Sequence, residues 1–77
     1  MVSTFVVHTQ SKPDALARVV LLFHRALNIE VLKLVHIKKA DVLQMTISVE
    51  ADGAQSQLIE ANLHKVVDVL LVDNITT

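Results

Sequence analysis

The segment Val42–Glu50 reads VLQMTISVE and alternates apolar and polar side chains along its length. Because successive side chains of a β-strand point to opposite faces, this alternation predicts a strand with one buried face. The segment Asn28–Ile37 (NIEVLKLVHI) is also rich in β-branched residues, and the polar run Lys38–Asp41 separates the two. The two segments are therefore expected to form a β-hairpin. The face expected to be buried carries Leu43, Met45, Ile47 and Val49.

A helix is expected before the hairpin, beginning near Lys12. Ser11 can cap it, Pro13 suits its first turn, and Asp14 falls three residues after Ser11. Leu21 and Leu22 fall outside its apolar stripe. Contact with a partner and chance are two explanations for these additional apolar residues. The stripe itself recurs at spacings of three and four residues and comprises Leu16, Val19, Val20, Phe23 and Leu27.

A second helix is expected after the hairpin, where Asp52 can cap it and Gln55 follows three residues later. Its apolar residues at helical spacing are Leu58, Ile59, Leu63 and Val66. Two further strands are expected at the ends of the chain, over Val2–Thr9 and Val67–Ile75.

The predicted order is strand, helix, strand, strand, helix, strand. That order favours an α+β, ferredoxin-like fold, a four-stranded antiparallel sheet with both helices on one face. Right-handed crossovers then place the first and third strands in the middle of the sheet and the second and fourth at its edges. We expect one domain over residues 1–77, with pairing of an edge strand to a second copy as a homodimer.

Composition excludes several classes of function. The 77-residue chain is 52% apolar and 19% charged, has no Cys, and carries a net charge of −1. The missing cysteines exclude disulfides and thiolate metal sites, and the near-neutral charge gives no field that would gather nucleic acid or a membrane surface. The apolar excess suggests that the chain shares apolar surface with a partner or with a second copy. With no basic leader after Met1, we expect a cytoplasmic protein.

Catalytic and cofactor motifs are missing from the sequence. The four histidines (His8, His24, His36 and His64) lack metal-ligand spacing, and His8 and His36 could meet only if the ends of the first two strands came together. Gly53 is the only glycine, so no glycine-rich phosphate loop exists. We therefore predict no catalytic residues, no metal and no cofactor.

Two stretches resemble one protein family. Residues 15–30 read ALARVVLLFHRALNIE, and residues 63–76 read LHKVVDVLLVDNIT. They resemble, in order and register, the ACT domain of the small regulatory subunits of acetolactate synthase (acetohydroxyacid synthase), in its short single-domain form. The resemblance implies a noncatalytic subunit that binds and activates a thiamine-diphosphate-dependent catalytic subunit in branched-chain amino-acid biosynthesis. Many members of the family also confer feedback inhibition by valine.

The resemblance also implies an effector site at a dimer interface. One half corresponds to Ser11, Asp14 and Ala15 at the start of the first helix, and the other half to Asn28 and Ile29 of the second copy. Asn28 also suits a helix C-cap, and both roles are open. Valine-sensitive members have Asn at the position of Ser11 and Gly at that of Asp14. The carboxylate of Asp14 would repel an effector carboxylate, so we expect weak or no valine response.

Two other functions stay open at this stage. One is a stand-alone ACT protein that binds an amino acid as a sensor without an enzyme partner. The other is a domain that serves only in assembly.

Overall fold

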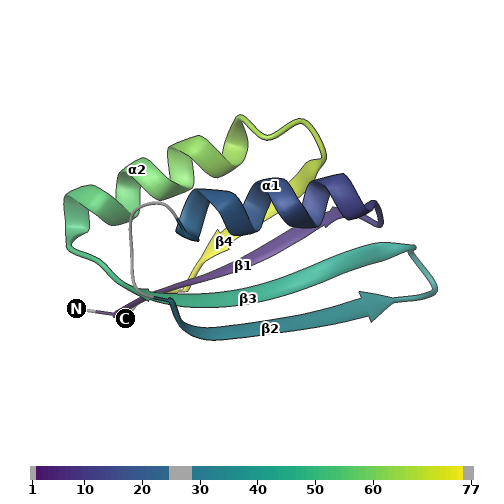
Figure 1. Ribbon diagram of the computed structural model, residues 1–77, viewed down its shortest axis with the longest axis horizontal. Helices are drawn as coiled ribbons and strands as arrows, with labels where there is room; N and C mark the ends of the chain where they lie inside the picture. The colour runs from purple at the N-terminus through teal and green to yellow at the C-terminus, as the bar shows by residue number, and fades with distance from the viewer. Residues whose placement is uncertain (1, 25–28, 76–77) are drawn as a thin grey trace.

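The sequence folds into six elements in the order β1, α1, β2, β3, α2, β4 (Figure 1). The structure is a computed structural model and describes residues 2–24 and 29–75. The bounds are β1 Val2–Gln10, α1 Pro13–His24, β2 Ile29–Ile37, β3 Val42–Glu50, α2 Gly53–His64 and β4 Val69–Asn74. The predicted order is confirmed. The last strand begins two residues later than expected, because the chain first forms a turn in which the Val69 amide donates to the Val66 carbonyl at 3.1 Å.

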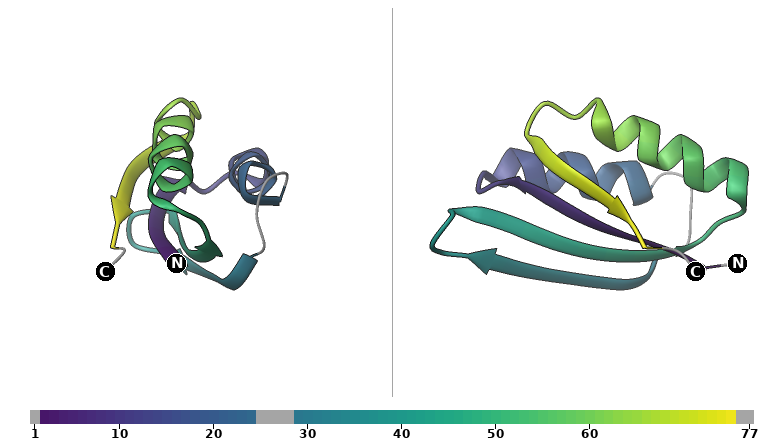
Figure 2. Two further views of the ribbon diagram at one scale, coloured as in Figure 1. Left: turned by 90° about the vertical axis from the view of Figure 1, so that its left-hand side faces the viewer. Right: turned by 180° about the vertical axis from the view of Figure 1, so that it is seen from behind.

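The four strands form one antiparallel sheet in the order β2-β3-β1-β4, so β1 and β3 are central as predicted. Both helices lie on the same face of this sheet (Figures 1 and 2). The tip of the β2–β3 hairpin, the start of α1 and the segment that connects α2 to β4 all lie toward one end of the molecule (Figure 1). This end brings together three loops that are far apart in the sequence.

The core lies between the helices and the sheet. In β1 the buried positions alternate with less buried ones, and Phe5 and Val7 are fully buried. The ring of Phe23 from α1 packs on Phe5 with a centroid distance of 5.8 Å and an interplanar angle of 60°. The tilted geometry is one that aromatic pairs prefer. The remaining apolar core residues are Val19, Met45, Ile47, Val49, Ala51, Ile59 and Leu63.

The two helices differ from expectation in detail. Asp52 and Gln55 form the predicted capping box at the start of α2, where the Asp52 carboxylate accepts from the Gln55 amide at 2.7 Å. Leu58 is 63% exposed rather than buried, and the buried face of α2 uses Ser56 instead. In α1, Leu21 is exposed as expected, but Leu22 packs partly against the core.

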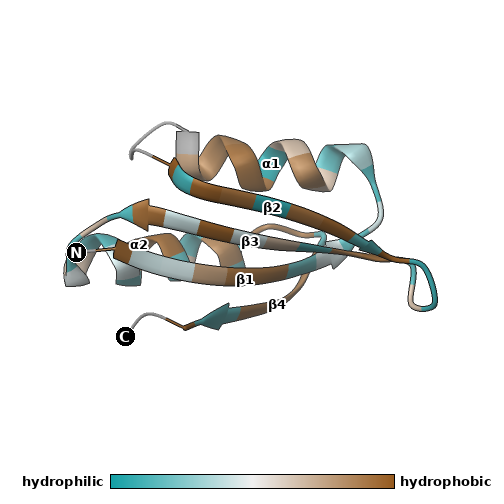
Figure 3. Ribbon diagram, turned by 90° about the horizontal axis from the view of Figure 1, so that it is seen from below, coloured by the Kyte–Doolittle hydropathy of each residue, from teal (hydrophilic) through white to brown (hydrophobic). Residues whose placement is uncertain are grey.

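The β2 strand is the least covered element of the sheet. Seven of its nine residues, from Glu30 to His36, are exposed. Figure 3 shows β2 as an outer strand with extended apolar stretches. Its exposed apolar side chains are Val31, Leu32, Leu34 and Val35. No helix in the described part of the chain is long and apolar enough to cross a membrane.

Candidate effector site

The first half of the predicted site lies where β1 passes into α1. Ser11 and Lys12 connect the two elements, and the Lys12 amide donates to the Gln10 carbonyl at 2.8 Å. Asp14 is exposed in the first turn of α1, whereas Ala15 is fully buried. The start of a helix is electrostatically positive, so the Asp14 carboxylate is favourably placed there. An effector carboxylate approaching the same helix start would meet this negative charge.

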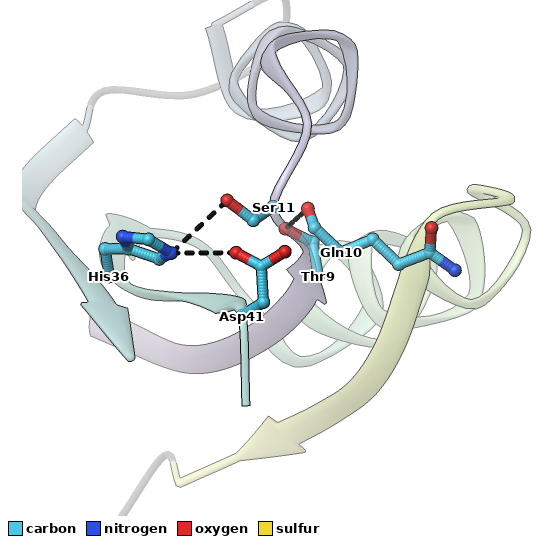
Figure 4. Close-up of polar contacts among 5 residues, drawn as sticks. All are labelled: Thr9, Gln10, Ser11, His36 and Asp41. Carbon is cyan, nitrogen blue, oxygen red and sulfur yellow. Dashed lines mark hydrogen bonds and ion pairs between the residues drawn. The ribbon is translucent and has the colours of Figure 1, made fainter. Parts of the chain in front are cut away.

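The side chain of Ser11 does not cap α1 as the sequence suggested. Its Oγ lies 3.4 Å from His36 Nε2, and the same Nε2 lies 3.1 Å from Asp41 Oδ1 (Figure 4). These contacts join the β1–α1 loop to the β2–β3 hairpin. Both contacts fall on one ring nitrogen, whereas a serine nucleophile and an orienting carboxylate need opposite nitrogens of the base. The cluster therefore lacks the geometry of a catalytic triad.

Asp41 adopts a left-handed backbone conformation with φ of 52°. Asp is one of the few residue types that tolerate this region, which closes the turn between β2 and β3. The Asp41 amide donates to the Lys38 carbonyl at 3.3 Å. The turn thereby fixes the carboxylate of Asp41 next to His36.

Asp68 links the same β1–α1 loop to the turn that precedes β4, at the edge of the sheet opposite β2. Its carboxylate is nearly buried and lies 3.9 Å from Lys12 Nζ and 3.6 Å from an Arg18 guanidinium nitrogen. Its backbone carbonyl accepts from the Gln10 amide at 3.0 Å. Sequence reasoning placed Asp68 on the last strand and gave it no role. It lies just before β4, where it holds the start of α1.

His8 and His36 lie in different strands and have different surroundings. His8 lies in the central strand β1 opposite Gln44, while His36 turns toward Ser11 and Asp41. Within residues 2–24 and 29–75, no three His, Asp or Glu side chains are grouped to hold a metal ion. His8 Nδ1 is buried and has no hydrogen-bond partner among the described residues.

The second half of the predicted site lies at the other end of the sheet. Ile29 begins β2 and is paired with Val49, whereas Ile37 ends β2 and is paired with Val42, next to Gln10. Asn28 lies outside the described residues. A single chain therefore does not bring Ile29 near Ser11, Asp14 and Ala15.

Solved structures with the same fold define the class to which this architecture belongs. The acetolactate synthase small subunit from Thermotoga maritima superposes with a TM-score of 0.83 at 23% sequence identity, covering 96% of this chain. The ACT domain of GTP pyrophosphokinase from Chlorobium tepidum gives 0.82 at 13% identity, covering 97% of each chain. The fold is thus that of an ACT domain. This chain spans only 47% of the Thermotoga subunit.

The sequence places the chain in a narrower class than the fold does. A family model of AHAS small subunit-like ACT domains matches residues 5–71. The chain belongs to this family, as the two sequence stretches indicated. No curated protein matches the sequence.

Proposed function

We propose that this protein is a noncatalytic regulatory subunit that binds and activates the catalytic subunit of acetolactate synthase in the cytoplasm. The observation that carries the proposal is the family match over residues 5–71. We take residues 1–77 as a single ACT domain. The thiamine diphosphate needed for the reaction would belong to the catalytic subunit, and this chain would contribute no cofactor and no catalytic residue.

The proposal includes a homodimer formed by antiparallel pairing of two β2 strands. The free edge of β2 and its four exposed apolar side chains favour this pairing, because an uncovered edge strand invites association. Antiparallel pairing about a two-fold axis brings the start of one β2 next to the end of the other. Ile29 of one copy would then lie beside Ile37 of its partner, close to the loop that carries Ser11.

This dimer would unite the two halves of the effector site. Ser11 and Asp14 of one copy would face Asn28 and Ile29 of the other, whereas Ala15 is fully buried in its own chain and would only support this loop. The exposed Asp14 carboxylate supports the further proposal that valine has weak or no effect, since valine also presents a carboxylate to the positive helix start. The chain would therefore act mainly as an activator.

The proposal is tested by measuring acetolactate formation by the catalytic subunit of the source organism. Rates are compared with and without this protein, each in the presence and absence of valine. Activation that valine leaves unchanged supports both the regulatory role and the altered effector site. Activation that valine suppresses would keep the regulatory role and contradict the role given to Asp14. No activation and no complex would contradict the regulatory role.

A gain-of-function variant tests the placement of the effector site. Ser11→Asn combined with Asp14→Gly removes the carboxylate and frees the backbone at the helix start. Calorimetric titration of this variant with valine should show heat of binding that the unchanged protein lacks. The single substitution Ser11→Asn is the matched control, because it retains the Asp14 charge. Equal heats for the double variant and the control would show that the site lies elsewhere.

A stand-alone amino-acid sensor is the second candidate function. Its support is that the fold alone does not call for an acetolactate synthase partner, because an ACT domain of the same fold occurs in a GTP pyrophosphokinase. Thermal melts of this protein alone against the twenty amino acids separate the two candidates. A rise in melting temperature with one amino acid, without complex formation with the catalytic subunit, would favour the sensor.

A further inference from the structure

A second apolar surface lies along the other edge of the sheet. It consists of Val67, Leu70, Leu71 and Ile75, which are 79%, 54%, 55% and 49% exposed. We name these four residues the β4 patch. Figure 3 shows β4 as the outer strand opposite β2. Exposed apolar residues grouped at one edge are typical of a protein interaction site.

A bulge in β4 accounts for the exposure of two adjacent leucines, Leu70 and Leu71. His8 is paired with Leu71 and Thr9 with Val69, so the register shifts at this point and Leu70 is left without a partner in β1. Successive residues of a regular strand point to opposite faces, and one of two adjacent leucines would then face the helices. A bulge re-aims side chains, and here both leucines are exposed.

The β4 edge is poorly suited to a second copy of this chain. The β4 strand has six residues and a bulge, whereas β2 has nine residues and a long row of exposed apolar side chains. If β2 pairs with itself across a two-fold axis, self-pairing of β4 as well would join the dimers into a tetramer or a longer array. In a dimer that stays closed, any molecule that covers the β4 patch is therefore different from this chain.

We infer that the β4 patch is the docking surface for a different protein with an apolar surface, which is the acetolactate synthase catalytic subunit. This inference rests on the proposed function for the identity of the partner. The exposed carboxylate of Asp73 lies on the same strand and favours a cation on the partner's rim. A dimer joined through β2 presents two β4 patches at the two ends of its paired sheet. It would therefore bind two catalytic subunits.

The test compares two variants of the β4 patch with a control. Leu70→Gln combined with Leu71→Gln removes the apolar side chains from the strand, and Val67→Gln alters only the preceding turn, where a 79% exposed side chain contributes little to folding. Leu58→Gln is the control, because Leu58 is equally apolar and 63% exposed on α2. Affinity for the catalytic subunit is measured by calorimetry and oligomeric state by light scattering, with circular dichroism as the check on folding.

The expected result is a loss of affinity of about tenfold or more for the double variant and a smaller loss for Val67→Gln, with the control unchanged. All three variants should remain dimers. Unchanged affinity of folded patch variants would overturn the inference and leave the regulatory role intact. Conversion of a patch variant to monomer would also overturn it, by showing that β4 pairs with a second copy. If the unchanged protein itself fails to bind, the proposed function fails and the docking surface with it.

Discussion

Replacing Leu34 with Lys should convert the proposed dimer to monomer. Leu34 lies near the middle of β2 and is 48% exposed. Complete burial of a leucine side chain stabilises by roughly 1.5–3 kcal/mol, so covering the exposed half contributes about 1 kcal/mol in each copy. Two copies lose about 2 kcal/mol, which raises the dimer dissociation constant by about 30-fold. The new charges near the two-fold axis increase the loss.

The other contacts of the interface are too weak to compensate for this loss of binding free energy. Four half-exposed side chains in each copy contribute roughly 8 kcal/mol by the same reasoning, and association itself costs about 4–15 kcal/mol. Backbone hydrogen bonds between the two β2 strands must supply the remainder. Because the net free energy of association is small, the removal of one leucine from each copy should strongly weaken the dimer.

Sedimentation equilibrium over a range of protein concentrations measures the dissociation constant directly. Leu58→Lys places the same charge on a leucine of α2 that is 63% exposed and lies away from β2, and it should leave the constant unchanged. Thermal melts check that Leu34→Lys still folds, which its partial exposure favours. A folded Leu34→Lys protein with the dissociation constant of the unchanged protein would refute the β2 interface.

Three further substitutions test local features of the fold. Asp68→Asn removes the charge that faces Lys12 and Arg18. It should lower the free energy of unfolding in urea by only about 1 kcal/mol, because both cations are more than half exposed. A loss of the same size in 1 M salt would show that the effect does not come from the ion pairs. Asp41→Ala should be less stable than Asp41→Gly by about 1 kcal/mol, since both lose the histidine contact and only alanine is strained at positive φ; equal stabilities would argue against the strain. Asp52→Ala should cost about 1 kcal/mol in thermal or urea unfolding, while Asp52→Asn, which still caps, should change little; an equal loss in both would mean that the cap is not responsible.

The regular parts of the fold could be predicted because their signals are local. The alternation in Val42–Glu50 matches the bounds of β3, and its apolar side chains Met45, Ile47 and Val49 are buried. The capping box likewise depends on Asp52 and Gln55 alone. Strand order followed from connectivity and handedness rather than from particular residues.

The rotation of α2 could not be predicted in the same way. Leu58 and Ile59 are both apolar, and helical spacing does not decide which of two neighbours faces the sheet. The buried position near them is Ser56, whose Oγ accepts a hydrogen bond at 3.3 Å from Asn74 Nδ2 at the end of β4. This hydrogen bond joins a buried serine to an exposed asparagine 18 residues away, and no local sequence pattern predicts such a pair.

The candidate site was predicted only where sequence similarity supplied it. Ser11 and Asp14 lie together at the start of α1, but Ser11 contacts His36 near the end of β2, and the adjacent Lys12 pairs with Asp68 in the turn before β4. The contact from Ser11 to His36 spans 25 residues. Such pairs depend on how the ends of strands meet, which follows from the whole topology. The pairing with Asn28 and Ile29 remains a prediction, because it needs a second chain.

The arrangement of the sheet sets a physical requirement for any effector response. The effector site would lie at the β2 pairing, whereas the catalytic subunit would dock at β4, and β3 and β1 lie between them. Neighbouring strands are about 4.8 Å apart, so roughly 14 Å of packed sheet separates the two edges. One end of the molecule bridges this span with polar contacts, from His36 through Ser11 to the β1–α1 loop, and from Lys12 to Asp68 at the start of β4. These contacts connect the proposed effector loop with Asp68, which directly precedes β4.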